Sequence, residues 1–317
     1  MNILIIGAGS IGISVGTSMI SEGANVSFHA SQLTASVMEE NGVKRTGIFK
    51  QISCSPDEFE VYSDYKKMTR KFFDYIFVCT KTIANDEVST KLNKNRDILK
   101  DSGKIIIFQN GFANDEPYLR FFDKNQVFCA RVISGFKRTK RNISEITVHA
   151  APLLLGSLQN VDAEVLKPVA QMLSSSGIPS DTTNELAKFL WDKMLFNCTL
   201  NPLSAILEVT YGQLTENEYS LQIMDKLIDE IYNVIIASGY TVDWKSADEY
   251  KEFFYSKLII DAYKHVSSTL QDIQHENKTE IDSLTGTVIS LGKKYNVDVS
   301  TNQMIYNLIK AIESRYL

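Results

Sequence analysis

The stretch N-I-L-I-I-G-A-G-S-I-G, from Asn2 to Gly12, decides the fold expected for the amino-terminal half of this chain. Asn2–Ile6 is a short continuous apolar run, which is typical of a parallel strand buried on both faces. Glycines follow directly in the spacing G-x-G-x-x-G, and a helical pattern runs from Ser10 to Glu22. The sequence therefore predicts a strand, a tight glycine turn and a helix, in that order.

This glycine spacing, between a strand and a helix, indicates a dinucleotide-binding turn rather than an ordinary glycine turn. Gly7 permits the tight turn, Gly9 lets the backbone approach a pyrophosphate, and Gly12 lets the helix pack closely on the strand. The N–H groups at the amino end of the helix would bind the phosphates. The predicted cofactor-binding residues of the turn are Gly7, Ala8, Gly9, Ser10, Ile11 and Gly12.

Short β-rich runs alternate with helical stretches in the first half of the chain, and helical periodicity dominates after about Asn184. Alternation of this kind predicts an α/β protein. We expect an amino-terminal Rossmann-type doubly wound sheet in residues 1–183 and a carboxyl-terminal all-helical domain in residues 184–317. The expected strands are Asn2–Ile6, Asn25–His29, Asp74–Cys79, Lys104–Gln109, Val127–Ser134, Ile146–His149 and Leu153–Gly156. The expected carboxyl-terminal helices are Glu185–Asn201, Ser220–Ser238, Ala247–Tyr263, Glu280–Tyr295 and Gln303–Arg315.

Composition narrows the class of protein. The 317 residues are 44% hydrophobic and 22% charged, with a net charge of −5, so no global attraction to nucleic acid or to an anionic membrane is expected. The basic run Lys137–Arg141 is interpreted as a solvated turn between strands. Four scattered cysteines and four scattered histidines form no zinc spacing, which predicts free thiols and no bound metal.

No apolar run reaches the ~20 residues of a membrane span, and the amino terminus lacks the pattern of a signal peptide. We therefore expect a cytoplasmic protein with a small-molecule substrate. The sequence leaves the oligomeric state open, a homodimer included.

The end of the second expected strand bears on the choice of cofactor. It reads Phe28-His29-Ala30-Ser31-Gln32, without the acid that would bind a free ribose 2′-hydroxyl and without an arginine for a 2′-phosphate. The missing acid favours NADP, and NAD is not excluded. Lys81 and Asn110 each follow a later strand, at the carboxyl edge of the sheet where ligands bind. Both are candidate cofactor contacts, with a surface lysine and a plain Asn-Gly turn as the alternatives.

A polar stripe lies on an otherwise apolar helix in the sequence W-D-K-M-L-F-N-C-T-L-N-P. Lys193, Asn197 and Asn201 stand at i, i+4 and i+8 and drift by only roughly 80° around the helix axis. A snorkelling lysine with two locally bonded asparagines is the alternative explanation. Three such residues in register favour a polar cleft. Because Asn201 precedes Pro202, we expect the helix to end or kink there.

An ammonium group opposite a nicotinamide suggests carbonyl reduction, because it can stabilise the negative charge that develops on oxygen and then supply the proton. Asparagines donate and accept together and can orient a keto acid. A second polar cluster, Ser267–Asp272, precedes Thr279-Glu280-Ile281-Asp282. Thr279 or a neighbour is expected to cap the following helix, with Glu280 and Asp282 in its first turn.

These residues resemble the ketopantoate reductase (2-dehydropantoate 2-reductase) family over nearly the whole chain. The resemblance is carried by G-A-G-S-I-G, V-C-T-K, Q-N-G, W-D-K-M-L-F-N-C-T-L-N-P-L-S-A, S-S-T-L-Q-D-I and N-K-T-E-I-D. The glycine motif is shared by many oxidoreductases, whereas the lysine-asparagine helix followed by the last two motifs is far more specific.

The resemblance implies an NADP-binding domain, a helical domain with the active site between them, and reduction of 2-dehydropantoate to pantoate on the route to pantothenate and coenzyme A. It implies Lys193 as general acid and Glu280 near both the lysine and the cofactor. The remaining implied contacts are Asn197, Asn201 and Ser268 for substrate, and Lys81 and Asn110 for cofactor.

Three positions depart from the family pattern. Ser31 stands where an arginine is usual, although Lys44 or Arg45 could substitute, and a substrate-side asparagine is replaced near Tyr211. Phe136 stands where a small residue is usual. These changes keep two alternatives open: a related reductase of another 2-keto acid, and a non-catalytic NADP-sensing protein.

Overall fold

The computed structural model describes all 317 residues, and the chain divides into two compact units. The first unit comprises Met1–Gln109 and Asn114–Leu186, and the second comprises Asn110–Ala113 and Ala187–Leu317. The sequence predicts one continuous domain in residues 1–183 and does not distinguish Asn110–Ala113 from it. This short segment leaves the end of a strand in the first unit and packs with the helices of the second.

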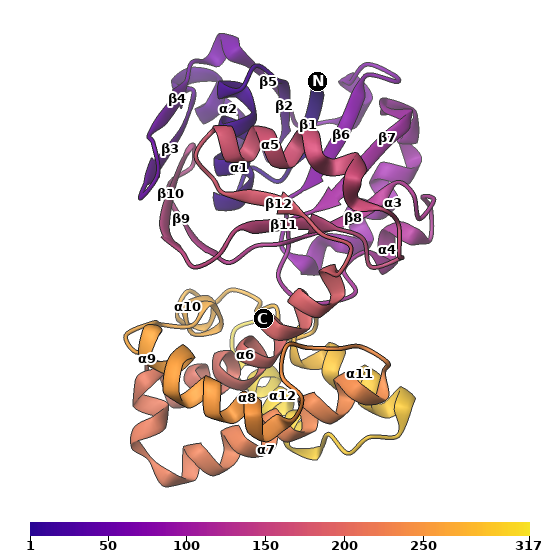
Figure 1. The fold of residues 1–317 in the computed structure, drawn as a ribbon. Helices are drawn as coiled ribbons and strands as arrows, with labels where there is room; N and C mark the ends of the chain where they lie inside the picture. The colour runs from indigo at the N-terminus through magenta and orange to yellow at the C-terminus, as the bar shows by residue number, and fades with distance from the viewer. The chain divides into compact units, whose positions relative to one another are not determined.

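The first unit is built on an eight-stranded sheet in the order β12-β11-β8-β7-β6-β1-β2-β5 (Figure 1). Six of these strands run parallel, and β11 pairs antiparallel with β8. The strands are β1 (Asn2–Ile6), β2 (Asn25–His29), β5 (Phe59–Tyr62), β6 (Phe73–Val78), β7 (Leu99–Ile107), β8 (Val127–Arg131), β11 (Leu153–Gly156) and β12 (Ser180–Thr182). This confirms the predicted Rossmann-type doubly wound sheet.

The strand order reverses beside β1. From β1 the chain builds outward through β2 and β5 on one side, and from β6 through β7 and β8 on the other. Such a switch point leaves a crevice at the carboxyl ends of the two central strands, where open α/β sheets bind ligands. The glycine turn after β1 and Thr80-Lys81 after β6 both lie at this edge.

A second sheet has the order β4-β3-β10-β9, with β3 (Val43–Gly47), β4 (Ile52–Cys54), β9 (Ser134–Lys140) and β10 (Ile143–His149). Helix α1 (Ser10–Ser21) lies on the main sheet and also contacts β3, β4 and β10 (Figure 1). Because both sides of α1 are covered, every residue from Gly12 to Ile20 is buried, hydroxyl residues included. Ser14 Oγ donates to Ser144 Oγ on β10 at 2.8 Å, which satisfies one of these buried polar groups.

The remaining helices of the first unit are short. They are α2 (Gln32–Asn41), α3 (Asn85–Lys94), α4 (Glu116–Leu119), α5 (Lys167–Ser175) and 3-10 turns at Pro56–Glu58, Tyr65–Lys67, Thr82–Ala84, Arg96–Ile98 and Ala163–Leu166. The core between α1, α5 and the sheet includes Ile5, Val15, Phe28 and Leu173, all with fully buried side chains. All four cysteines are buried free thiols.

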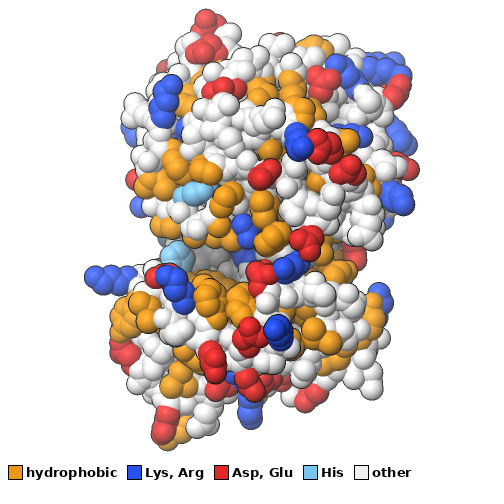
Figure 2. Space-filling model, viewed as in Figure 1, with side chains coloured by type: hydrophobic (Ala, Val, Ile, Leu, Met, Phe, Trp, Pro, Cys, Tyr) orange, Lys and Arg blue, Asp and Glu red, His pale blue; other side chains and the backbone are white.

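The second unit is helical, as predicted from the sequence. Its helices are α6 (Leu186–Leu207), α7 (Glu218–Ala237), α8 (Ala247–Phe253), α9 (Ile259–Asp261), α10 (Ser268–Gln274), α11 (Thr285–Tyr295) and α12 (Ser300–Glu313), with a 3-10 turn at Gly212–Glu216 and a π-helical turn at Phe254–Leu258. None of the helices combines the length and the apolar character that a membrane span requires. Figure 2 shows Lys and Arg side chains interspersed with Asp and Glu side chains on the visible face of each unit.

Three local predictions were wrong. Helix α6 does not end before Pro202 but continues to Leu207, because Leu200, Leu203 and Ser204 are almost fully buried and this packing compensates for the missing backbone hydrogen bond of the proline. The run Lys137–Lys140 lies in strand β9 and not in a turn, although its side chains are exposed as expected.

The third correction concerns the helix expected from Glu280. Helix α11 begins only at Thr285, and residues 280–284 form a turn before it. Glu280 and Asp282 are therefore not first-turn acids of that helix, and Thr279 does not cap it. Another segment of the chain holds this turn in place instead, as described below.

Candidate active site

The glycine turn after β1 is enforced by close approach of backbone and side chains. Gly7 has φ of +97°, and a Cβ atom there would lie 2.8 Å from the backbone nitrogen of Thr80. A Cβ atom at Gly12 would overlap the carbonyl oxygen of Gly7 and press against Ile5 and Cys79. Side chains at these two positions would therefore push α1 away from the sheet.

Gly9 has the opposite surroundings. A Cβ atom there would meet only the Cys79 carbonyl oxygen, at 4.0 Å, so the space before the helix is open. Gly9 is the N-cap of α1 in extended conformation, no side chain caps the helix, and no acidic residue lies in its first turn. Unsatisfied N–H groups with open space before them fit a phosphate group, so the residues of this turn fit the predicted dinucleotide.

Ser31 forms part of a hydroxyl and arginine cluster at the start of α2. Ser31 is the N-cap of the helix, and its Oγ lies 3.2 Å from Thr34 Oγ1. Arg138 of β9 donates from Nη2 to Thr34 Oγ1 at 3.2 Å and to the carbonyl oxygen of Arg141 at 2.7 Å. Partial burial, and secondarily the nearby Arg141, lower the pKa of Arg138. β9 thus places a guanidinium beside the start of α2, although Arg138 and Thr34 lie over 100 residues apart in the sequence.

Arg45 cannot serve this purpose, which corrects the suggestion made from its position in the sequence. Its side chain is fully buried and donates to Ser18 Oγ, to the Ser176 carbonyl oxygen and to the Lys50 carbonyl oxygen. Burial lowers the pKa of Arg45 to about 10. It links β3 to α1 and α5 and has no face left for a ligand.

The carboxyl ends of β6 and β7 are joined by a buried amide pair that the sequence analysis missed. Gln109 Nε2 donates to Asn85 Oδ1 at 2.7 Å, and Asn85 Nδ2 donates back to Gln109 Oε1 at 3.0 Å. Gln109 Nε2 also donates to the Thr80 carbonyl oxygen at 2.9 Å, and Tyr118 OH donates to Asn85 Oδ1 at 3.2 Å. The pair fixes the backbone directly before Lys81, which is the extended residue that precedes the Thr82–Ala84 turn.

In the second unit, three predicted site residues lie together. Lys193 Nζ donates to Asn110 Oδ1 at 2.6 Å, and Asn110 Nδ2 donates to Glu280 Oε2 at 3.5 Å. We call this group the Lys193 cluster (Lys193, Asn110 and Glu280). The Asn110 amide connects the ammonium group to the carboxylate, and both Lys193 and Asn110 are only half-buried. The sequence predicts Asn110 as a cofactor contact and does not indicate its hydrogen bond with the lysine.

The segment that carries Asn110 is held by aromatic and backbone contacts. The Phe112 ring lies 4.7 Å from the ring of Trp191 on α6 and 5.0 Å from the ring of Tyr240. The Phe112 N–H donates to the Ser283 carbonyl oxygen at 3.4 Å. The segment is thus attached both to the helix of Lys193 and to the turn of Glu280, which explains how residues far apart in sequence share one geometry.

The two asparagines of the stripe differ in their surroundings. Asn197 is half-buried like Lys193, whereas Asn201 is 4% exposed. Tyr211 OH donates to Asn201 Oδ1, and Ser267 Oγ donates to the Asn201 carbonyl oxygen at 3.2 Å. With Oδ1 occupied by the tyrosine, the Nδ2 group of Asn201 is the end that remains to meet a ligand. Tyr211, near which the asparagine usual in the family pattern is replaced, therefore orients this amide.

Ser268 is exposed and is the first residue of α10. Its neighbour Ser267 is fully buried, caps α10 by accepting from the Leu270 N–H at 3.0 Å, and contacts Asn201. Ser267 was not among the predicted site residues, although the capping pattern before Leu270 could have identified it. No group of three or more His, Cys, Asp or Glu side chains is arranged to hold a metal ion.

Comparison with known proteins assigns the family. Residues 3–160 match the family model described as ketopantoate reductase PanE/ApbA, and residues 185–313 match the model of its carboxyl-terminal domain. A 2-dehydropantoate 2-reductase of Aquifex aeolicus is 34% identical over 99% of this chain and 97% of its own length. One of Archaeoglobus fulgidus is 24% identical over 98% of this chain and 97% of its own.

Solved structures share the fold. A PanE/ApbA family ketopantoate reductase from Ralstonia eutropha superposes with a TM-score of 0.85 at 21% identity, covering 100% of this chain and 99% of that one. A D-mandelate dehydrogenase solved with NADH and anilino(oxo)acetate gives a TM-score of 0.85 at 19% identity, with the same coverage. The two matched domain models and the full-length relative agree with the resemblance seen in the sequence motifs, and the chain belongs to the ketopantoate reductase family of oxidoreductases.

Proposed function

We propose that this protein reduces 2-dehydropantoate to pantoate with NADPH, on the route to pantothenate and coenzyme A. The observation that supports the proposal most directly is the Lys193 cluster. In this cluster an ammonium group donates a hydrogen bond to an amide, and the amide donates one to a carboxylate. The full-length relatives named 2-dehydropantoate 2-reductase support the choice of substrate.

In this proposal Lys193 is the general acid. When bound, the reduced nicotinamide supplies the hydride that adds to the keto carbon. Lys193 Nζ stabilises the charge that develops on the keto oxygen and transfers a proton to it, which completes the hydroxyl group. The Lys193 amine is then reprotonated from solvent before the next turnover.

Asn110 and Glu280 prepare the lysine for this role. Asn110 Oδ1 accepts from Lys193 Nζ at 2.6 Å and so restrains the flexible side chain in one orientation. Glu280 accepts from Asn110 Nδ2 at 3.5 Å and so helps to orient the Asn110 amide with its Oδ1 towards the lysine. An ammonium group can donate more than one hydrogen bond, so Lys193 can contact the substrate oxygen while it is held by Asn110.

The substrate contacts are assigned to Asn197, Asn201 and Ser268. Asn197 lies one turn of α6 beyond Lys193, and Asn201 lies one turn further, so both can reach a small acid held beside the amine. The Asn201 Nδ2 group, oriented by Tyr211, suits a carboxylate or hydroxyl oxygen of the substrate. Ser268 contributes an exposed hydroxyl at the start of α10.

The cofactor is assigned as NADPH, with the glycine turn, Lys81 and Asn110 as its contacts. Arg138 supports the phosphorylated form, because its guanidinium lies within hydrogen-bonding distance of Thr34 at the start of α2. An arginine beside this position accommodates a 2′-phosphate, and no acid is present to bind a free 2′-hydroxyl. NADH remains the alternative to be compared directly.

A second candidate is the reduction of another 2-keto acid, and Tyr211 is the observation that favours it. Its ring is buried and lies 5.5 Å from Phe196 and 5.0 Å from His265, so aromatic groups surround the amide of Asn201. A substrate with an apolar or aromatic substituent would suit these rings.

The test is a panel of 2-keto acids assayed with NADPH and with NADH, following the oxidation of the reduced cofactor by absorbance. We expect the highest kcat/KM for 2-dehydropantoate with NADPH. A higher value for another keto acid would establish the second candidate. Binding of NADPH without turnover of any acid in the panel would indicate the non-catalytic sensing protein instead.

A further inference from the structure

The turn that carries Glu280 has no helix of its own to hold it, because α11 begins only at Thr285. We call residues 277–284 the Glu280 loop. Its position decides where the Glu280 carboxylate lies relative to Asn110 and Lys193. The structure shows which residues fix it, and they come from the carboxyl-terminal helix α12.

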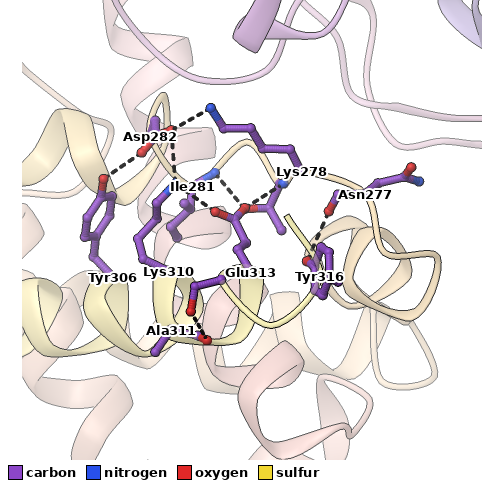
Figure 3. Close-up of polar contacts among 11 residues, drawn as sticks. Asn277, Lys278, Ile281, Asp282, Tyr306, Lys310, Ala311, Glu313 and Tyr316 are labelled. Carbon is purple, nitrogen blue, oxygen red and sulfur yellow. Dashed lines mark hydrogen bonds and ion pairs between the residues drawn. The ribbon is translucent and has the colours of Figure 1, made fainter.

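Glu313, at the end of α12, makes the most direct contact with this loop. Its Oε1 accepts from the Thr279 N–H at 2.8 Å and from Thr279 Oγ1 at 2.6 Å. Lys310 Nζ lies 2.7 Å from Oε2, one helical turn away. Figure 3 shows the Glu313 carboxylate directed at the chain between Lys278 and Ile281. We call the two hydrogen bonds from Thr279 to Glu313 the clamp. Because Thr279 immediately precedes Glu280, the clamp fixes the backbone next to Glu280.

The burial of Glu313 makes this contact unusual. Its side chain is 2% exposed and Thr279 is fully buried, whereas carboxylates are seldom buried without compensation. Burial would raise the pKa of Glu313, but the hydrogen bonds from Lys310 and Thr279 outweigh it, and the pKa is lowered. Glu313 is thus a buried carboxylate whose Oε1 accepts from Thr279 of the Glu280 loop and whose Oε2 forms an ion pair with Lys310.

Helix α12 also holds the far side of the loop. Tyr306 OH donates to Asp282 Oδ1 at 2.6 Å, and Lys310 Nζ lies 3.6 Å from Asp282 Oδ2 (Figure 3). Between the two anchors, the Ile281 side chain is fully buried against Ala205 of α6 and Ile309 of α12. Glu280 is therefore flanked on both sides by residues attached to α12, while its own side chain reaches Asn110.

From these contacts we infer that Glu313 is a positioning residue of the reaction: its buried carboxylate clamps Thr279 and thereby places Glu280 against Asn110 and Lys193. Glu313 itself touches no reacting group. The inference rests on the proposed function, because it assigns Glu313 a role in the turnover that Lys193 and Glu280 perform.

The first test compares Glu313→Gln with Glu230→Gln, a matched control on α7 that contacts the other end of α12. Glu230 accepts from the N–H groups of Thr301 and Asn302 at 2.8 and 2.9 Å and so anchors the start of the same helix. We expect Glu313→Gln to lower kcat about tenfold or more, since small displacements of a catalytic group have effects of this order. The dissociation constant for NADPH should change less than about twofold, and Glu230→Gln should leave kcat within about twofold. Equal losses of kcat in both variants would mean a general effect on stability and would overturn the inference.

The second test is a double-mutant cycle with Glu280→Gln. If Glu313 acts through Glu280, the double variant has the same kcat as Glu280→Gln alone, because the clamp then positions a side chain that no longer carries the charge. Losses that multiply would show that Glu313 acts independently of Glu280. Thr279→Val, which removes one of the two bonds to Glu313 and keeps the ion pair with Lys310, provides the same cycle if Glu313→Gln does not fold.

A third measurement does not depend on activity. Amide hydrogen exchange at Thr279 and Ile281 should accelerate about tenfold or more in Glu313→Gln and remain unchanged in Glu230→Gln, because only the first variant weakens the clamp. Unchanged exchange in the Glu280 loop would defeat the inference even with an active enzyme. Failure of the wild-type protein to reduce any keto acid would defeat the proposed function while leaving this exchange result readable.

Discussion

The glycine turn of the first unit and the Lys193 cluster of the second are built in different ways. The turn is local: Gly7, Gly9 and Gly12 act within one strand-turn-helix, and steric contact within a few ångströms explains two of them. The cluster joins residues 83 and 170 positions apart, and its geometry depends on Phe112, Trp191 and the Glu280 loop. The glycine turn is therefore expected to tolerate almost no change at its own residues. The Lys193 cluster can also be disturbed by changes at residues outside it.

The largest effect is expected at Gly12. Gly12→Ala places a Cβ atom against the Gly7 carbonyl oxygen, so α1 must move off the sheet and the phosphate-binding N–H groups move with it. We expect loss of measurable NADPH binding by fluorescence titration, together with a lowered Tm. The control is Gly286→Ala in α11, where the added atom would find its nearest neighbour at 3.4 Å and binding should persist. Normal NADPH affinity in Gly12→Ala would show that the close packing of the turn is dispensable.

Removal of the amine tests the assembled region. Lys193→Ala should lower kcat by at least about a hundredfold, the range expected for losing a positioned acid, while NADPH still binds. Lys188, a partly buried lysine of the same helix paired with Asp243, is the matched control, and Lys188→Ala should leave kcat within about threefold. Unchanged turnover in Lys193→Ala would remove the lysine from the mechanism and leave the cluster without a catalytic role.

Arg138 sharpens the comparison, because it is distant in sequence and lies beside Thr34 at the start of α2, where we propose that the 2′-phosphate binds. Arg138→Gln should weaken NADPH binding about tenfold and leave NADH binding nearly unchanged, since a charge-assisted contact to a phosphate contributes roughly 1.5 kcal/mol. Lys137→Gln, at the neighbouring position on the opposite face of β9, is the control. Titration of each variant with both cofactors measures the effect, and an equal loss for NADPH and NADH would argue against recognition of a 2′-phosphate.

The smallest effect is expected on stability at Asp192, next to Lys193 in sequence. Burial, and then the neighbouring Asp243, raise the pKa of Asp192 to about 7. Between about pH 4 and 7 the folded protein retains a proton that the unfolded chain releases, so the contribution of Asp192 to stability falls as the pH rises through this window. Asp192→Asn should therefore raise Tm by about 2 °C or more at pH 8 and by less at pH 5. A constant gain at both pH values would show that Asp192 does not titrate in this range.

The sequence motifs predicted most of the local architecture. The sequence located β1, β2 and β11 with their observed bounds. β1 was found as a continuous apolar run, the pattern of a strand buried on both faces, whereas β2 and β11 were found as short β-rich runs. The spacing of Lys193, Asn197 and Asn201 indicated a shared helix face, and α6 contains all three. Their roles in substrate binding and proton transfer stay predictions until they are measured.

Local pattern failed where packing overrides propensity. Pro202 suggested a helix end, but burial around it carries α6 on to Leu207. Thr279 and Glu280 suggested a capped helix, yet Thr279 is bonded to Glu313 and the helix starts later. In both cases the deciding partner lies in another element, and no local reading of the sequence contains it.

The sequence by itself determined the strand-glycine-helix start, the α/β class followed by helices, and the residue types of the site, because hydrophobic period and glycine spacing act over a few residues. Only the tertiary structure decided that Arg138 lies beside Thr34 and that Asn110 links Lys193 to Glu280. It alone also decided that Glu313 holds the Glu280 loop. These contacts join segments tens to over a hundred residues apart, and side chains at such separation meet only when the packed core of one unit brings their elements together.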